Sequence, residues 1–231
     1  MTHSMHDIGC RPARFRVGFL GVAMTLALVC AAVGPQTAFS AEKEQQISRV
    51  IAKEMTAAQK ALQANQWQEA LKNLEAAEAK SGLTPFDQKT IHYFKGFANI
   101  KLNNLKVAQG EFEKALATGA ATAEEKAQYT KTLFGIAAST QQFQKAIDYG
   151  KEMADAGTAS PNDIAIIAQS YFQLKDCKNS GIWVDKAVAA SRKAGEAPKE
   201  NLYLFKLQCA SDAGDNAAMV PVLTDLIKLN N

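Results

Sequence analysis

Few side chains in this sequence are of the types that carry out chemistry. His92 is the only histidine after residue 6, so a hydrolytic triad or a histidine-based metal site lacks the partners that it needs. Cys177 and Cys209 form no Cys-x-x-Cys pair, and the glycines of the body do not gather into a phosphate-binding loop. We therefore expect no catalytic residue, no metal site and no cofactor, and we predict that the protein is not an enzyme.

Acidic residues occur in close pairs, and carboxylates are the groups that general acid–base chemistry most needs besides histidine. Glu111 and Glu113, like Glu124 and Glu125, fall among lysines on expected helix faces. Charges mixed in this way are typical of solvated surfaces, and no spacing indicates two acids that flank one bond. We expect these glutamates to lie at the surface and His92 to be structural or at the surface.

The N-terminus has the pattern of an export signal. A cluster of arginines precedes the apolar residues 17–33, and small residues stand at positions −3 and −1 before Ala41. We expect residues 1–40 to be a cleaved signal peptide of the general secretory type and the body to be periplasmic. The alternative is an uncleaved inner-membrane anchor that faces the periplasm, because seventeen apolar residues are at the short edge of what spans a bilayer.

The charge of the chain excludes some classes of partner. The formal net charge is +3 at pH 7, and the arginines near the N-terminus supply most of it. A nearly neutral body has no electrostatic footprint for nucleic acid or for an anionic membrane. We therefore expect no nucleic-acid partner, and membrane association only if the signal stays uncleaved.

Cysteine usage points to the redox state of the compartment. Cys177 and Cys209 are the only cysteines after residue 40. An even pair in an exported protein favours a disulfide, and the alternative is two ordinary buried thiols.

An internal repeat organises the body of the chain. Trp67-x-x-Ala70 recurs as Leu105-x-x-Ala108 and Phe143-x-x-Ala146, each time after a polar turn, with degenerate copies at Cys177-x-x-Ser180 and Asn216-x-x-Met219. Good helix formers dominate after residue 41, and glycine and proline stand between the apolar-periodic segments. The steps between copies run from 34 to 39 residues, which is the period of a helix–turn–helix repeat.

This pattern resembles the tetratricopeptide repeat (TPR) family, in which a small residue in the first helix of each copy meets one near the start of the second. The first-helix position falls on Ala58, Gly96, Phe134, Ala168 and Leu207, and the second-helix position on Ala70, Ala108, Ala146, Ser180 and Met219. The resemblance implies an all-α fold, a right-handed α-solenoid of about five TPR-like repeats in residues 41–231. The copies are expected at about residues 51–84, 89–122, 127–160, 161–194 and 200–231.

In that family, certain first-helix positions line an inner, concave groove. Transferred residue by residue, they include Tyr93, Phe97, Lys131, Gln169, Phe172 and Gln173. Glutamines can pair with a ligand backbone while aromatic rings supply apolar contact. The resemblance therefore implies a scaffold or adaptor that binds a peptide segment or a partner protein of the cell envelope. Two alternatives stay open: these side chains pack against the neighbouring copy, or the protein is a membrane-anchored structural subunit of a transport or secretion complex.

The C-terminal end raises a separate question. The sequence stops at Asn231, directly after the last expected helix, and no polar capping element is visible. Solenoids usually finish with such an element. Either something covers this end or a C-terminal extension has been lost, and a homodimer through the uncapped end is one hypothesis.

Overall fold

The fold is taken from a computed structural model, which describes residues 46–229. These residues belong to a single unit that begins at residue 44. The expected signal peptide, residues 1–40, lies outside the described residues, so both the cleaved and the anchored interpretation stay predictions.

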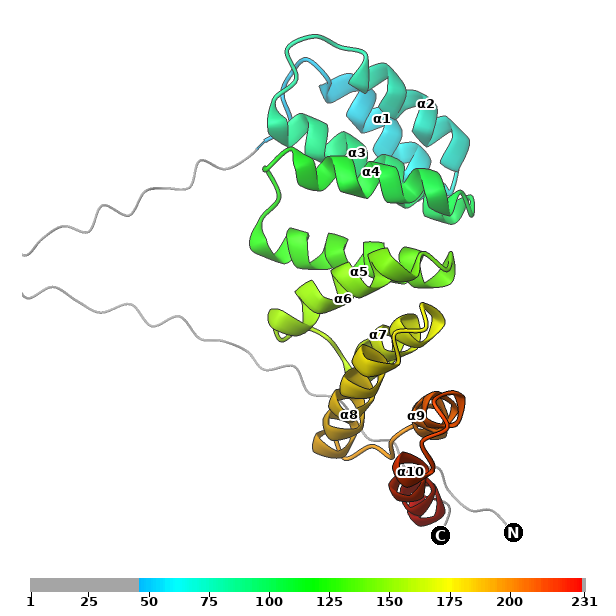
Figure 1. The fold of residues 1–231 in the computed structure, drawn as a ribbon. Coiled ribbons are helices and arrows are strands. Elements are labelled where there is room, and N and C mark those ends of the chain that lie inside the picture. The colour runs from blue at the N-terminus through cyan, green and yellow to red at the C-terminus, as the bar shows by residue number, and fades with distance from the viewer. Residues whose placement is uncertain (1–45, 230–231) are drawn as a thin grey trace, which may run out of the picture. The chain divides into compact units, whose positions relative to one another are not determined.

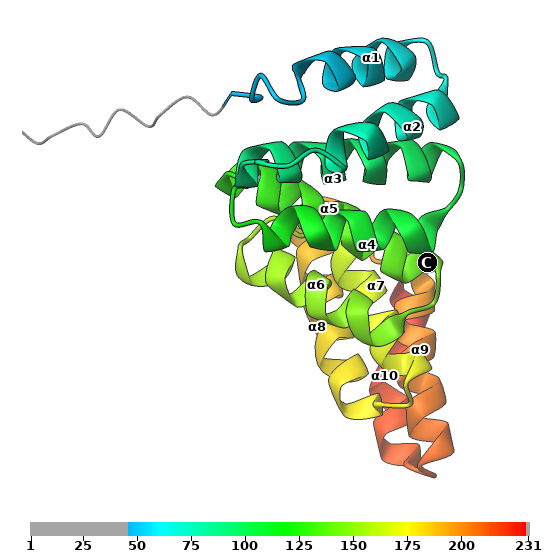
Figure 2. The same ribbon diagram turned by 90° about the horizontal axis from the view of Figure 1, so that it is seen from above.

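Ten α-helices and no strand make up the described residues. The helices are α1 (Ala52–Gln63), α2 (Trp67–Glu78), α3 (Pro85–Lys101), α4 (Leu105–Ala117), α5 (Ala123–Ser139), α6 (Phe143–Asp155), α7 (Pro161–Gln173), α8 (Cys177–Lys193), α9 (Glu200–Asp212) and α10 (Asn216–Leu229). They form five pairs, α1/α2 to α9/α10, and each helix packs mainly on the helices next to it in the chain. Figures 1 and 2 show the pairs following one another in sequence order. This is the helical solenoid that the repeat predicts.

Capping boxes fix where three of the first helices start. The Thr84, Thr122 and Ser160 side chains each accept a hydrogen bond from the backbone amide three residues on, and the acidic side chain at that later position accepts one from the cap residue's amide. This exchange satisfies two amides that a helix N-terminus otherwise leaves unpaired. Helices α3 and α5 therefore start at Pro85 and Ala123, about one turn before the copy boundaries expected at 89 and 127.

The turn within each pair follows one scheme. The residues that reverse the chain have left-handed backbones: Asn65, Asn103, Gln141, Lys175 and Gly214, with φ between 57° and 66°. The amide of the residue after each of them returns to a carbonyl near the end of the first helix, as in Gln142 N to Ala137 O at 2.9 Å. These turns coincide with the polar turns of the sequence repeat.

The core lies between the helices as three apolar clusters that span neighbouring pairs. One joins α1 and α2 to Ile91 of α3, a second joins α3 and α4 to Leu133 of α5, and the third runs from α5 to α10. The small residues of the repeat belong to this core: Ala58, Ala70 and Ala108 have no exposed surface, and their size lets the helices approach closely. Each copy is thus stabilised by its neighbours, as in a solenoid.

Phe134 is a large side chain at a position where the repeat expects a small one. It is accommodated by Gly150, which lies opposite on α6: a methyl group on Gly150 would stand 2.9 Å from the Phe134 ring. One copy earlier the sizes are reversed, with Gly96 on α3 against Phe112 on α4. The pair of positions, rather than either residue alone, sets the spacing between the two helices.

A disulfide joins the last two copies. Cys177, at the start of α8, and Cys209, in α9, are linked with an S–S distance of 2.03 Å and Cα atoms 5.6 Å apart. Across residues 46–229, no helix has both the length and the apolar character needed to cross a bilayer.

Candidate peptide-binding surface

The six residues predicted for the groove lie on three first helices. Tyr93 and Phe97 are on α3, Lys131 is on α5, and Gln169, Phe172 and Gln173 are on α7. The lysine and both glutamines are exposed, whereas the three aromatic side chains are partly buried. The polar side chains are therefore accessible to a ligand, whereas the aromatic side chains also pack against other residues of the protein.

Tyr93 packs across the junction between the second and third copies. Its ring stacks on Tyr129 of α5, with centroids 5.4 Å apart and an interplanar angle of 23°. It also makes an edge contact with Phe112 of α4 at 6.1 Å. Since offset-stacked and edge-on rings are the favoured aromatic arrangements, this contact stabilises the packing of α3 on α5.

Phe172 repeats this arrangement two copies later. Its ring stacks on Phe205 of α9, with centroids 4.8 Å apart. Phe97 instead makes an edge contact with Trp67 of α2 at 6.0 Å, and the Lys101 ammonium lies 5.3 Å from the Phe97 centroid. The alternative that these side chains pack against a neighbouring copy thus holds for all three aromatic residues, although each keeps part of its surface exposed.

A cavity of about 260 Å³ opens beside the Tyr93–Tyr129 stack. It lies between α3 and α5 and is lined by Phe86, Lys89, Thr90, Tyr93, Phe94, Glu125, Gln128 and Tyr129. Four of these eight side chains are aromatic. The cavity is therefore suited to an apolar or aromatic side chain of a bound segment.

The charges at this cavity are paired within the protein. Lys89 donates to Glu125 at 2.6 Å, its side chain is 4% exposed, and its ammonium lies 4.3 Å from the Phe86 centroid. Burial raises the pKa of Glu125, but hydrogen bonds from Lys89 and from the Thr122 amide outweigh it and lower the pKa overall. Burial, and then the charge of Glu125, raises the pKa of Tyr129, which keeps its hydroxyl protonated and able to donate.

Several residues of this surface were missed by the sequence reasoning. Leu204 of α9 is 46% exposed and stands three residues before Leu207, as Tyr93 stands before Gly96. Applying the position of Tyr93 to the fifth copy therefore identifies Leu204 from the sequence. Tyr129 and Phe205 fall outside the first-helix positions that the family assigns to the groove, so the resemblance does not mark them as part of a binding surface.

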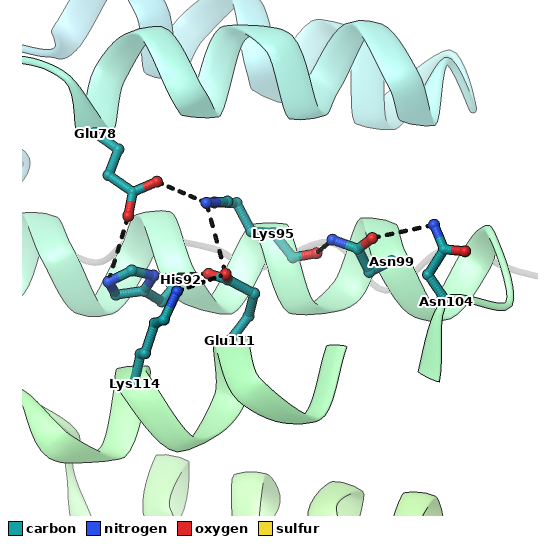
Figure 3. A network of polar contacts seen from close by, with 7 residues as sticks. All are labelled: Glu78, His92, Lys95, Asn99, Asn104, Glu111 and Lys114. Carbon is teal, nitrogen blue, oxygen red and sulfur yellow. Dashed lines mark hydrogen bonds and ion pairs between the residues drawn. The ribbon is translucent and has the colours of Figure 1, made fainter. Parts of the chain in front are cut away.

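The interpretation of Glu111 as a surface residue is wrong. Its side chain is 7% exposed and accepts hydrogen bonds from Lys114 at 3.0 Å and from His92 Nδ1 at 2.8 Å (Figure 3). Lys95 lies between Glu111, at 3.6 Å, and Glu78 of α2, at 2.6 Å. The acidic side chain is held inside because two lysines and a histidine from α3 and α4 surround it, and the repeat pattern carries no information about that pairing.

The same cluster gives His92 a structural place. It is fixed between two carboxylates, those of Glu111 and of Glu78, whose Oε1 lies 4.0 Å from Nε2. Asn99 continues the network by donating to the Lys95 carbonyl and accepting from Asn104 (Figure 3). Among the described residues, no group of three or more His, Cys, Asp or Glu side chains is arranged to hold a metal ion.

Comparison with known proteins defines the fold alone. No family model matches the chain, and no curated protein matches it. Among solved structures, MamA from Desulfovibrio magneticus RS-1 is similar with a TM-score of 0.52 at 14% identity, over 80% of this chain and 97% of that one. MamA of AMB-1 has a TM-score of 0.55 at 12% identity, over 78% and 91%. YrrB, described as a TPR protein with an unusual peptide-binding site, has a TM-score of 0.54 at 13% identity, over 76% and 84%. The described residues therefore have the fold of a TPR-type helical solenoid.

Proposed function

We propose that this protein is a non-enzymatic interaction scaffold that binds an extended protein segment along the first-helix surface of α3, α5, α7 and α9. The observation that supports the proposal most directly is the cavity beside Tyr93 and Tyr129, continued along the chain by exposed Gln169 and Gln173. An apolar side chain of the ligand occupies the cavity, and the glutamine amides pair with its backbone.

The charge of the surface indicates the kind of segment. Lys101 and Lys131 are exposed, while Glu125 is already neutralised by Lys89. A segment with an aromatic or aliphatic residue and a few carboxylates matches this arrangement better than a basic one, because unpaired cations on the surface favour acidic partners.

A peptide-display selection against the purified body tests the proposal. The selected peptides are then titrated by fluorescence anisotropy against wild type and the variant Lys131→Glu/Gln169→Ala/Gln173→Ala, whose three positions are exposed and are expected to leave the fold intact. A matched control, Gln68→Ala/Lys72→Glu, changes exposed residues of the second helix α2. We expect the groove variant to weaken binding by about tenfold or more and the control to leave it unchanged. Equal binding by wild type and both variants places the ligand elsewhere.

We further propose that the scaffold works in the periplasm, on partners of the cell envelope. The export-signal pattern of residues 1–40 supports this, and so does the Cys177–Cys209 disulfide, because such bonds persist in oxidising compartments. Cell fractionation with an intact-mass measurement is the test. A soluble periplasmic protein that begins at Ala41 is expected, whereas a full-length protein in the inner-membrane fraction favours the anchored structural subunit.

A further inference from the structure

The last helix carries an exposed apolar stripe. Val220, Leu223 and Ile227 of α10 are 63%, 42% and 63% exposed. Their spacing of three and four residues places them on one face of the helix. Large aliphatic side chains gathered on one face, rather than scattered singly, indicate a surface that another molecule covers.

The equivalent positions on the second helices of earlier copies are covered by other helices. Counted from the small residue of each second helix, Leu223 corresponds to Leu74, Phe112 and Val184, which are at most 2% exposed, and to the buried Gly150. At that position in α6, a methyl group on Gly150 would meet Ile167 of α7 at 2.5 Å, and in α4 the Phe112 ring lies 5.8 Å from Tyr129 of α5. In both copies this position lies against the first helix of the next copy as well as against the first helix of its own copy.

The flanking positions repeat the result. Val220 corresponds to the buried Gln109 and Ile147 and to the half-buried Leu71 and Gly181. Ile227 corresponds to the buried Val188 and to the half-buried Glu78, Leu116 and Ala154. The stripe on α10 thus lies at positions that are buried or half-buried in every earlier copy, and on α10 alone all three are exposed.

We propose that a second copy of this chain covers the stripe, with α10 packed on α10 of the second copy about a two-fold axis. The proposal concerns a different surface from the groove and does not depend on peptide binding.

The opposite end of the solenoid argues against head-to-tail stacking. In α1, exposed lysines occupy two positions that are buried in the next two first helices: Lys53 matches Ile91 and Tyr129, and Lys60 matches Ala98 and Ile136. Stacking α1 onto α10 of a second copy would remove both ammonium groups from water without a carboxylate on the stripe to pair them. An interface between two identical faces avoids this cost.

The stripe is complementary to itself. Its three residues are spaced almost symmetrically about Leu223, so in an antiparallel crossing Ile227 of one copy meets Val220 of the other and the two Leu223 side chains meet near the axis. This is the self-matching that a two-fold interface requires. A helix of 14 residues is about 21 Å long, which makes the contact small, and we expect a micromolar rather than a nanomolar dimer.

Sedimentation velocity of residues 41–231 between about 1 and 200 µM tests the proposal. We expect a monomer–dimer equilibrium in wild type, a shift toward monomer of at least about tenfold in Leu223→Glu, and no shift in the control Val107→Glu, which changes a 52% exposed valine of α4. Circular dichroism verifies that each variant is folded. A wild-type monomer at every concentration, whatever covers the stripe, overturns the proposal.

A cysteine introduced near the axis tests the symmetry. Thr224 is exposed beside Leu223, so Thr224→Cys alone is expected to form an intermolecular disulfide on mild oxidation. Cross-linking that occurs only when Thr224→Cys is mixed with Lys60→Cys would show head-to-tail stacking and overturn the two-fold arrangement. Because Leu223 is exposed on the second helix α10 and not on the first-helix surface proposed to bind the segment, Leu223→Glu should keep peptide affinity, which separates failure of the dimer from failure of the scaffold proposal.

Discussion

At the scale of single residues, the combined size of two facing side chains stays the same between copies two and three, while the size at either position changes. Gly96 faces Phe112 in the second copy, and Phe134 faces Gly150 in the third, so glycine and phenylalanine exchange helices. In both copies one phenylalanine ring fills the space that the facing glycine leaves between the helices. A single-position rule for small residues identifies Phe134 as an exception, whereas a rule for the pair identifies it as regular.

Gly150→Ala is therefore expected to destabilise the protein although it replaces glycine inside a helix. The new methyl group would lie 2.5 Å from Ile167 Cγ1 and 2.9 Å from the Phe134 ring. Overpacking costs about 1–3 kcal/mol, and the gain in helix propensity offsets about 1 kcal/mol of it. Urea denaturation gives the free energy of unfolding.

The matched control is Gly135→Ala in the neighbouring helix α5. An added methyl group there meets nothing within 4 Å, so only the propensity gain remains and stability should rise by up to about 1 kcal/mol. Equal effects of the two substitutions would show that the contact of Gly150 with Ile167 does not govern the spacing of α6 and α7.

Glu111 gives stability a dependence on acid pH. Burial raises the pKa of Glu111, but hydrogen bonds from His92 and Lys114 and the charges of Lys95 and Lys114 outweigh it and lower the pKa from 4.5 to about 2. A carboxyl group whose folded pKa lies below its unfolded pKa stabilises the fold fully above pH 4.5. That contribution, up to about 3 kcal/mol, is lost as the pH falls from 4.5 toward 2.

Comparison with Glu111→Gln isolates this contribution. The variant should be less stable than wild type at pH 7, because Lys95, whose side chain is 12% exposed, and Lys114 lose a charge partner. The difference between the two proteins should shrink between pH 4.5 and 2 in urea denaturation series. A difference that stays constant over that range contradicts the assignment.

At the scale of helices and turns, all five turns within the helix pairs need a left-handed residue, but the residue types found there do not all favour that conformation. Asn65 and Asn103 suit the left-handed conformation, and Gly214 adopts it without cost, but Gln141 and Lys175 hold the same conformation with φ of 57° and 61°. Neighbouring helices hold these two residues in place, since both precede second helices that pack on the first helix of their own copy and on the first helix of the next one.

Gln141→Gly should for this reason stabilise the protein. A left-handed backbone costs a residue other than glycine, asparagine or aspartate about 1–2 kcal/mol, and glycine avoids this cost. Glycine is also more flexible in the unfolded chain, and ordering it on folding cancels about half of that gain. A net gain of about 0.5–1 kcal/mol is expected in thermal or urea unfolding. Gly214→Gln should have the opposite effect, and a loss of stability in Gln141→Gly would show that the Gln141 side chain makes a compensating contact.

The sequence predicts features that depend on neighbouring residues of one copy, and it misses features that depend on contacts between distant residues. The turns at Asn65 and Asn103 and the small residues Ala70 and Ala108 depend on local sterics that recur in every copy, so the repeat identifies them. The burial of Glu111 depends on cations supplied by α3 and α4, and the Tyr93–Tyr129 stack depends on residues 36 apart. Such pairings between elements are specific to one place in the solenoid, and a repeat pattern averages over them.

At the scale of the whole described chain, stability is expected to vary from copy to copy. Each helix packs on its sequence neighbours, so the free energy of opening one pair depends on that pair and the adjacent ones. The Cys177–Cys209 bond is the one covalent link between copies beyond the backbone among residues 46–229, and it joins only the fourth and fifth.

Removing that link should therefore loosen one end of the molecule and leave the rest unchanged. A loop of 32 residues closed by a disulfide stabilises by about 3–4 kcal/mol in the chain-entropy model. In Cys177→Ser/Cys209→Ser, amide hydrogen exchange in α9 and α10 should accelerate by about two orders of magnitude or more, while α3 and α4, held by the Glu111 cluster, keep the wild-type rates. Exchange measured by mass spectrometry on peptides from each helix resolves the two regions. A uniform acceleration across all ten helices would mean that the described chain unfolds as one cooperative unit, because only then does a constraint placed on two neighbouring copies protect every other copy equally.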